Sequence, residues 1–194
     1  MGWYPRGVGS IYDRIDERLA AFMERQPVFF VATAPLGADG HVNLSPKGYA
    51  ETFSIVDDHT VAYLDLVGSG AETIAHLREN GRITVMFCAF EGKPKILRLY
   101  GQGRAVQPDD PAFPDLRARF AERHGVRSVI VVDVTRIADS CGYAVPLMAF
   151  ESERDVLTGW HARRDDARLA AYQAEKNAAS IDGLPGLDPE AVAR

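Results

Sequence analysis

Residues 65–81 read Asp65-Leu66-Val67-Gly68-Ser69-Gly70-Ala71-Glu72-Thr73-Ile74-Ala75-His76-Leu77-Arg78-Glu79-Asn80-Gly81. The preceding residues 60–64 are rich in β-branched and aromatic side chains, which predicts a strand. After the glycines, Ile74 and Leu77 are spaced as on one face of a short helix. Gly81 is a typical helix stop, because glycine adopts the left-handed conformation without a Cβ penalty. The stretch therefore predicts a strand, a Gly-Ser-Gly turn and a helix.

The start of this helix has two interpretations. Ser69 is a natural N-cap, and Glu72 three residues later completes a capping-box pattern, in which both side chains satisfy free N–H groups of their own helix. Alternatively, the same N–H groups and the positive end of the helix dipole bind a phosphate, with added hydroxyl donors from Ser69 and Thr73. Glu72 would repel such an anion unless it turns away. The stretch by itself leaves both interpretations open.

The composition is that of one soluble globular domain. The chain has 194 residues, enough for a sizeable core, and a formal net charge of −5, which disfavours sequence-independent binding to nucleic acid. No apolar run reaches the length of a membrane span, and the first residues lack the apolar segment of a secretory signal. Cys88 and Cys141 have no nearby Cys or His partner, so reduced thiols are expected rather than a zinc site. A cytoplasmic location is the resulting expectation.

The residues before the central stretch predict a helix and then a hairpin. Apolar residues recur at helical spacing over 11–26, which predicts an amphipathic helix. Residues 28–34 predict a deeply buried strand, and residues 36–40 predict a hairpin loop. The next predicted strand, 41–45, alternates polar and apolar residues, so its polar face is expected to meet solvent or a polar ligand. That face consists of His41, Asn43 and Ser45, and Lys47 follows it.

The remaining chain predicts mostly strands and few helices. Gly101 and Gly103 lie inside one predicted strand and indicate a bend, a bulge or a close backbone approach. A helix is expected to start at Asp109-Asp110-Pro111, and the composition turns charged and helical from residue 151. Residues 180–187 carry three large apolar side chains, so we expect them to pack on another surface, such as a partner subunit. The other predicted strands cover 52–56, 60–64, 83–90, 95–106, 128–135 and part of 141–150.

These elements define a fold class. About seven short strands with hairpin-type links, and only three or four helices, predict a mainly β fold with flanking helices, built as an antiparallel barrel. A parallel α/β sheet is disfavoured, because most strands lack a helical crossover. We expect a single domain over 1–194, with the barrel core over 22–150 and a C-terminal helical extension and tail over 151–194.

Four motifs occur in a characteristic order between residues 22 and 134. They are Val42-Asn43-Leu44-Ser45-Pro46-Lys47-Gly48, Tyr63-Leu64-Asp65-Leu66-Val67-Gly68-Ser69, the helix end Arg78-Glu79-Asn80, and Arg98-Leu99-Tyr100-Gly101-Gln102-Gly103-Arg104. Their order and spacing, rather than any one motif, resemble the pyridoxamine 5'-phosphate oxidase-like family, the FMN-binding split barrels. The predicted antiparallel barrel is therefore expected to be a split β-barrel.

The resemblance implies a homodimer that holds two FMN molecules in clefts between subunits. Lys47 matches a strand lysine that reaches the cofactor, and Ser69 matches a phosphate-contacting serine at the helix start. Arg98 falls on a strand that, in relatives, meets the cofactor across the dimer interface. The cofactor-binding residues expected from the resemblance and the polar strand face are Asn43, Ser45, Lys47, Tyr63, Asp65, Ser69, Gly70, Thr73 and Arg98.

Two departures from the oxidase pattern concern phosphate and substrate. In the oxidase, a lysine follows the phosphate-contacting serine by two positions, where this chain has Ala71; altered cofactor binding, or compensation by an arginine elsewhere, is implied. The oxidase's C-terminal Arg and His motif, which holds the substrate phosphate, has no match after Val134, since Trp160-His161-Ala162-Arg163-Arg164 lies in a helical, charged context. We therefore expect a family member whose substrate is a small molecule other than pyridoxamine phosphate.

Three functions are compatible with these features. The first is an FMN-dependent oxidoreductase, in which the flavin carries the chemistry. The second is a deazaflavin (F420)-dependent reductase, in which Arg117, Arg119 and Arg123 contact a longer acidic cofactor tail. The third is a non-enzymatic flavin- or haem-binding module of the same fold. The sequence identifies no catalytic residue, because its five histidines are scattered and are expected to be structural or solvated.

Overall fold

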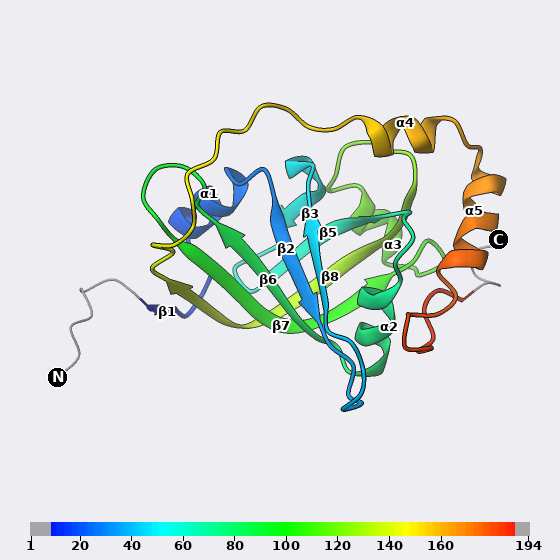
Figure 1. Ribbon diagram of the computed structural model, residues 1–194, viewed down its shortest axis with the longest axis horizontal. Coiled ribbons are helices and arrows are strands. Elements are labelled where there is room, and N and C mark those ends of the chain that lie inside the picture. Colours follow the sequence, from blue (N-terminus) through cyan, green and yellow to red (C-terminus); the bar gives the residue numbers. More distant parts are fainter. Residues whose placement is uncertain (1–8, 189–194) are drawn as a thin grey trace.

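A computed structural model describes residues 9–188 of the chain (Figure 1). In these residues eight strands form one antiparallel sheet with the order β3-β2-β6-β7-β8-β5-β4, and β1 pairs with β8. The sheet curls into a half-barrel with helices around it, so the predicted mainly β split barrel is confirmed (Figure 1). The strands are β1 (Ile11–Tyr12), β2 (Phe29–Thr33), β3 (Asn43–Lys47), β4 (Phe53–Ile55), β5 (Thr60–Leu66), β6 (Arg82–Cys88), β7 (Ile96–Val106) and β8 (Val126–Ser140). The helices are α1 (Glu17–Glu24), the 3-10 turn η1 (Ala50–Thr52), α2 (Glu72–Glu79), α3 (Phe113–Arg117), α4 (Val156–Ala162) and α5 (Asp166–Lys176).

The curl of the sheet puts one face of each long strand into a shared core. Successive strand side chains point to opposite faces, so along β2 Phe29 points inward and Phe30 outward. The Phe29 ring lies 5.3, 5.5 and 5.7 Å from the rings of Phe53, Tyr63 and Phe87. Aromatic contacts at this spacing add to the stabilisation from burial. The core therefore packs strands from both halves of the open sheet against one another.

The barrel stays open between its edge strands β3 and β4, since the described residues form no backbone ladder between these strands. Side chains bridge the opening instead. The Lys47 Nζ atom of β3 lies 3.5 Å from an Asp65 carboxylate oxygen of β5. The Asn43 amide of β3 donates to the Thr73 hydroxyl of α2 at 3.0 Å. The opening is consequently lined with polar groups where a closed barrel would have backbone hydrogen bonds.

Three predicted elements differ in the structure. Residues 11–26 are not one helix, because β1 pairs with β8 and α1 begins only after Asp16, whose carboxylate accepts from the Leu19 N–H at 2.9 Å. The helix expected from residue 109 begins at Phe113 and is short. Residues 141–155 contain neither helix nor strand, so the strand expected within 141–150 is wrong. Gly142 turns the chain there with φ 63°, and Pro146 has no N–H to offer a ladder.

The C-terminal residues return across the molecule. Residues 143–155, called the strap below, run from the end of β8 over the sheet to α4, and α5 then lies near the N-terminal end of α2 (Figure 1). The tail, residues 180–187, packs on its own chain through Leu187, whereas Ile181 is exposed. The Ile181 N–H donates to the Glu72 carboxylate at 3.3 Å, and Leu187 belongs to the core.

Candidate functional site

The segment between β5 and α2, residues 67–71, is called the α2 loop here. Ala71 occupies the N-cap position of α2 and forms no side-chain cap bond, so Ser69 is not the N-cap. Glu72 does not close a capping box either, because its carboxylate accepts from the Ile181 N–H of the tail. The capping interpretation of this stretch is therefore wrong. The predicted stop is confirmed: Asn80 caps the helix end, and Gly81 follows with φ 71°.

Two backbone carbonyl groups of the α2 loop accept hydrogen bonds from buried side chains of the protein. The Val67 carbonyl accepts from His161 Nε2 at 2.9 Å. The Gly68 carbonyl accepts from Asn177 Nδ2 at 2.8 Å and from Arg127 Nη1 at 3.4 Å. By contrast, the backbone N–H groups of Gly68–Ala71 form no hydrogen bond within residues 9–188. The loop thus has satisfied acceptors and free donors, and Ser69 and Gly70 are exposed.

An ion cluster lies beneath this loop in the opening of the barrel. The fully buried Asp65 carboxylate accepts from Arg127 Nε at 2.6 Å and from the Ser128 hydroxyl at 3.3 Å. Lys47 approaches the same carboxylate from β3, and its side chain is 24% exposed. The Lys47 ammonium also lies 5.8 Å from the centroid of the Tyr63 ring. The predicted residues Lys47, Tyr63 and Asp65 are thus together in the structure.

Burial and charge act in opposite directions on this cluster. Burial raises the pKa of the Asp65 carboxyl, but the Arg127 and Lys47 charges and the hydrogen bonds from Arg127 and Ser128 outweigh it, so the pKa is lowered. Burial together with the Asp65 charge raises the pKa of the Tyr63 phenol well above its ordinary value. The Tyr63 hydroxyl is buried and has no hydrogen-bond partner within residues 9–188. Asp65 is therefore an anion and Tyr63 a neutral phenol at neutral pH.

The predicted residues Asn43, Ser45 and Thr73 form a second polar group. Asn43 Nδ2 donates to the hydroxyls of Thr33 at 3.1 Å and Thr73 at 3.0 Å, and the Ser45 hydroxyl donates to Asn43 Oδ1 at 2.8 Å. Thr33 in turn contacts His76 Nδ1 at 2.9 Å. These bonds fasten α2 to the edge strand β3. His41, expected on the same strand face, precedes β3 and bonds to Asp182 of the tail.

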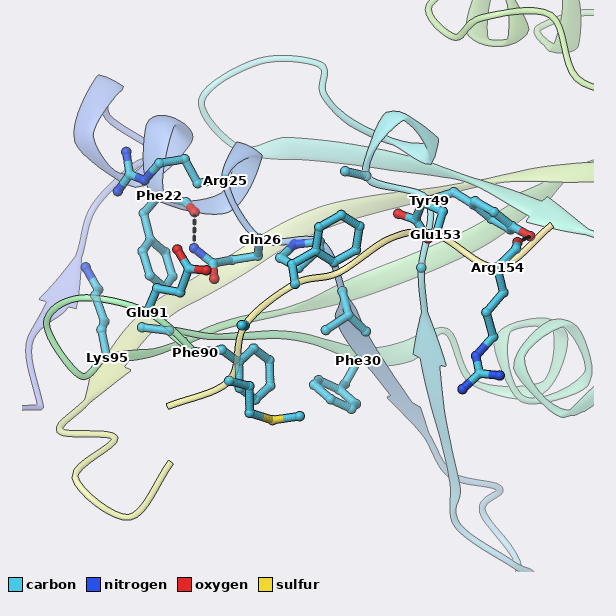
Figure 2. Close-up of a pocket in the computed structure, with 18 of the residues that line it drawn as sticks. Phe22, Arg25, Gln26, Phe30, Tyr49, Phe90, Glu91, Lys95, Glu153 and Arg154 are labelled. Carbon is cyan, nitrogen blue, oxygen red and sulfur yellow. Dashed lines mark hydrogen bonds between the residues drawn. The ribbon is translucent and has the colours of Figure 1, made fainter. Parts of the chain in front are cut away.

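The α2 loop borders a long groove of about 2360 Å³ beneath the strap. Figure 2 shows Phe30 and Phe90 along it, with Phe22 and Lys95 toward one end and Tyr49 and Arg154 toward the other. The Tyr49 hydroxyl donates to the Arg154 carbonyl at 2.7 Å, which ties the strap down at that end. Val67, Gly68 and Ser69 also line the groove. A ligand whose anionic end lies at the α2 loop would therefore have apolar surface beside it.

Arg98 is not brought to the other predicted site residues within one copy of the chain. It stands opposite Met86 of β6, which stands opposite Phe30 of β2, and cross-strand partners share a face of the sheet. Lys47 stands opposite Phe29 and therefore points to the other face. The Arg98 guanidinium donates to the Ser140 hydroxyl at 3.0 Å.

The structure adds three residues that the sequence prediction lacks, namely Arg127, His161 and Asn177. All three are buried and donate to the α2 loop. A buried carboxylate such as Asp65 requires a nearby cation, so the sequence could have predicted that Asp65 has a basic partner. His161 and Asn177 lie in the C-terminal helical region, where nothing local indicates a contact with the loop.

The arginines considered for a longer acidic cofactor tail are largely engaged by the protein. Arg117 donates to backbone carbonyls of residues 120, 121 and 123, and Arg119 donates to those of residues 55 and 56. Arg123 pairs with Glu51 and lies 4.2 Å from the centroid of the Tyr49 ring. Arg123 is thus the one of these three that contacts a residue lining the groove.

Other kinds of site find no support within residues 9–188. No group of three or more His, Cys, Asp or Glu side chains there is arranged to hold a metal ion. None of the helices in the described part of the chain is long and apolar enough to cross a membrane. Cys88 and Cys141 are free thiols, as expected, and burial raises the pKa of Cys88.

Fold and site together define an antiparallel split barrel with a donor-rich loop at the start of α2, and the sequence comparisons agree. Residues 15–141 match the family described as pyridoxamine 5'-phosphate oxidase. The chain is 38% identical over 192 residues to the pyridoxamine 5'-phosphate oxidase family protein ustO of Aspergillus flavus, an alignment that covers 91% of this chain and 77% of that protein. The chain therefore belongs to the pyridoxamine 5'-phosphate oxidase family.

Solved structures resemble the chain in fold. HupZ of Group A Streptococcus aligns with a TM-score of 0.50 and 20% identity, over 70% of this chain and 99% of that one. An FMN-binding protein from Syntrophomonas wolfei aligns with a TM-score of 0.44 and 15% identity, over 61% of this chain and 81% of that one. At 20% identity the likeness to HupZ concerns the fold alone.

Proposed function

We propose that this protein binds FMN, with the cofactor phosphate at the α2 loop, and that it is a flavin-dependent oxidoreductase acting on a small molecule. One observation carries the proposal: the N–H groups of Gly68–Ala71 have no partner within residues 9–188, although the neighbouring carbonyls are satisfied. Such donors at the start of a helix suit an anion, which the helix dipole also favours. The exposed Ser69 adds a hydroxyl to the same loop.

The charges near the loop also fit a phosphate. Lys47 and Arg127 face a single carboxylate, Asp65, so this cluster keeps one positive charge in excess. Arg127 lies directly under the loop, 3.4 Å from the Gly68 carbonyl. We infer that it compensates for the lysine that the oxidase pattern has at the position of Ala71. The Glu72 carboxylate accepts from the Ile181 N–H of the tail but lies against Gly70, so a phosphate at the loop requires the Glu72 side chain to turn away.

FMN, when bound, supplies two-electron chemistry, and the chain supplies placement and electrostatics. The groove of about 2360 Å³ exceeds the roughly 300–1,000 Å³ of an ordinary ligand pocket, so it has room for a substrate beside the cofactor. Phe30 and Phe90 offer apolar surface along it. The name of the Aspergillus relative, an oxidase family protein, supports an oxidoreductase.

We further propose that the protein works as a homodimer with its cofactor sites at the subunit interface. Within one copy, Arg98 lies on the face of the sheet opposite Lys47 and bonds to Ser140, so in this proposal the Arg98 that meets the cofactor comes from the second copy. The face that carries Arg98 also exposes Leu44 and Tyr100. An exposed apolar face of this kind is typical of an interaction surface.

The direct test is a cofactor titration. The purified protein, or the protein after addition of FMN, should show flavin absorbance near about 450 nm and a quenched flavin fluorescence. Lys47→Met should raise the Kd for FMN about tenfold, and Ser69→Ala about fivefold, because each loses one donor or charge near the phosphate. A protein that stays colourless with FMN, or two variants with unchanged Kd, would contradict the proposed site.

The same purified protein can be used to test the two alternative functions. Titration with deazaflavin F420 in place of FMN tests a deazaflavin-dependent reductase, for which Arg123 beside Tyr49 is the available cation. Addition of NADH or NADPH to the FMN complex tests for an enzyme, which should bleach the flavin and turn over with an acceptor. Tight flavin or haem binding without turnover would instead indicate a non-enzymatic module of the same fold.

A further inference from the structure

We propose that His161 and Asn177, from the C-terminal helical extension, are positioning residues that aim the N–H donors of the α2 loop at the cofactor phosphate. The inference rests on the flavin proposal above and assigns the C-terminal extension a role in it. His161 lies in α4, and Asn177 caps the end of α5. Both side chains are almost completely buried, so neither is available to touch a ligand in the groove.

The geometry of the peptide unit links each bound carbonyl of the loop to the N–H of the next residue. A trans peptide is planar, and its C=O and the N–H of the next residue point in opposite directions. His161 holds the Val67 carbonyl, which fixes the plane that carries the Gly68 N–H. Asn177 holds the Gly68 carbonyl, which fixes the plane that carries the Ser69 N–H. Both N–H groups are therefore turned away from the C-terminal helices.

The two side chains are themselves fixed by packing. A methyl group on Gly125 would lie 2.5 Å from the His161 ring, so the ring rests directly on the backbone at Gly125, where φ is 79°. The Asn177 backbone donates to the Gln173 carbonyl and accepts from the Leu187 N–H, each at 2.8 Å. These two backbone hydrogen bonds fix Asn177 between α5 and the tail, and so they restrict the position of its side-chain amide.

Because the loop contains two glycines, its peptide planes need outside contacts to fix their orientation. Glycine has more accessible backbone conformations than any other residue, so Gly68 and Gly70 leave the orientation of their peptide planes to outside contacts. A set of donors that is oriented before the ligand arrives binds it more tightly than one that must be ordered. The expected consequence is selective for the phosphate, because the isoalloxazine ring does not need these two peptide planes.

The experiment compares FMN with riboflavin, which lacks the phosphate. The wild-type protein should bind FMN at least tenfold more tightly than riboflavin in a fluorescence-quenching titration. Asn177→Leu and His161→Leu each remove a donor, and each should raise the Kd for FMN about tenfold and leave the Kd for riboflavin within about twofold. His161→Gln, whose amide can still donate to the Val67 carbonyl, should restore most of the FMN affinity.

The controls separate positioning from loss of stability. Leu169→Ala removes a buried side chain of α5 that makes none of the bonds to the loop, so it should lower the melting temperature without changing the ratio of the two Kd values. If Asn177→Leu does not fold, Asn177→Asp keeps the shape and still lacks the donor. Equal weakening of FMN and riboflavin, a selective loss in Leu169→Ala, or no rescue by His161→Gln would overturn the inference.

The outcome for the wild-type protein distinguishes the two proposals. If it binds FMN and riboflavin equally well, flavin binding stands, and the positioning role is overturned because the phosphate contributes nothing. If it binds neither flavin, the proposed function fails, and the positioning role fails with it.

Discussion

At the scale of single residues, Asp65 has the most demanding environment in the site. Its carboxylate is fully buried and is compensated by Arg127, Lys47 and Ser128. A buried ion pair adds little net stability over an apolar pair, but loss of one partner leaves an unpaired buried charge. The cluster is therefore better understood as a fixed arrangement of charge under the α2 loop than as a source of stability.

The first prediction follows from this arrangement. Asp65→Asn keeps the shape of the side chain and leaves Arg127 buried without its counter-charge, so we expect the free energy of unfolding to fall by about 3–5 kcal/mol. Asp133→Asn is the matched control: Asp133 is an exposed aspartate of β8, and its change should stay within about 0.5 kcal/mol. Urea unfolding followed by circular dichroism measures both. Equal effects at the two positions would contradict the importance of the cluster.

The second prediction concerns two buried histidines. Burial lowers the pKa of His76 and of His161. In the unfolded chain each imidazole regains a pKa of about 6.5, so below that pH the unfolded state binds more protons than the folded state. Stability should therefore fall as the pH drops from 7 to 5.5, by up to about 1.4 kcal/mol per pH unit for each histidine.

The same measurement at several pH values tests this expectation. The double variant His76→Asn, His161→Gln retains hydrogen-bonding groups but cannot take up a proton at either position. Its urea midpoint should depend less on pH between 7 and 5.5 than that of the wild-type protein. A wild-type midpoint that does not move over this range, or an equal slope in the double variant, would show that these imidazoles do not control acid stability.

At the scale of elements, the bend of β7 depends on Gly101. The register between β7 and β8 shifts between Tyr100 and Gly101, which is the bulge that an interior strand glycine predicts. A Cβ atom on Gly101 would lie 2.3 Å from the Asp133 carbonyl oxygen, a backbone atom that cannot simply move aside. The two longest strands of the sheet therefore pair closely only because residue 101 has no side chain.

The third prediction tests this contact. Gly101→Ala should lower the free energy of unfolding by about 1–3 kcal/mol, since the methyl group overpacks the β7–β8 ladder. Gly37→Ala serves as the matched control, because a methyl group on Gly37 would meet no atom within 4 Å. Thermal unfolding of the two variants should show a lower midpoint only for Gly101→Ala. Similar midpoints would mean that the ladder absorbs the methyl group.

The helix α2 shows what local sequence patterns can and cannot predict. Its end is predicted correctly, because a glycine stop depends on backbone conformation at one position. Its start is not, because the groups that hold the α2 loop come from far along the chain. His161 lies 94 positions from Val67, and Asn177 lies 109 positions from Gly68. These contacts replace the local capping box that Ser69 and Glu72 suggest.

The candidate site also has some residues that the sequence predicts and others that it does not. The family resemblance predicts that Lys47, Tyr63 and Asp65 share one site, and these three side chains lie together in the structure. Arg127 was not expected, because its place beside Asp65 depends on the register of β5 against β8, in which Asp65 stands opposite Ser128. Strand register between distant segments is a tertiary property that the sequence of either strand does not reveal.

At the scale of the whole molecule, the open sheet presents an apolar outer face. Leu44, Ala32, Thr84 and Tyr100 stand opposite one another across four neighbouring strands and so form one row on that face. Leu44 is 64% exposed and Tyr100 is 36% exposed. The next row contains Arg98, so the residue expected to cross the dimer interface lies on this same face.

The fourth prediction tests whether this face joins two copies of the chain. Leu44→Asp puts a charge at the β3 end of this apolar row, and desolvation of that carboxylate on association should convert the expected dimer to a monomer in light scattering. Leu36→Asp is the matched control, because Leu36 is also 64% exposed but lies in the β2–β3 hairpin loop, away from the row. Leu36→Asp should remain a dimer.

Because Arg98 and Lys47 lie on opposite faces of the sheet in one subunit, the monomeric Leu44→Asp variant should also lose affinity for FMN. A monomer that binds FMN as tightly as the wild type would place the whole cofactor site within one copy.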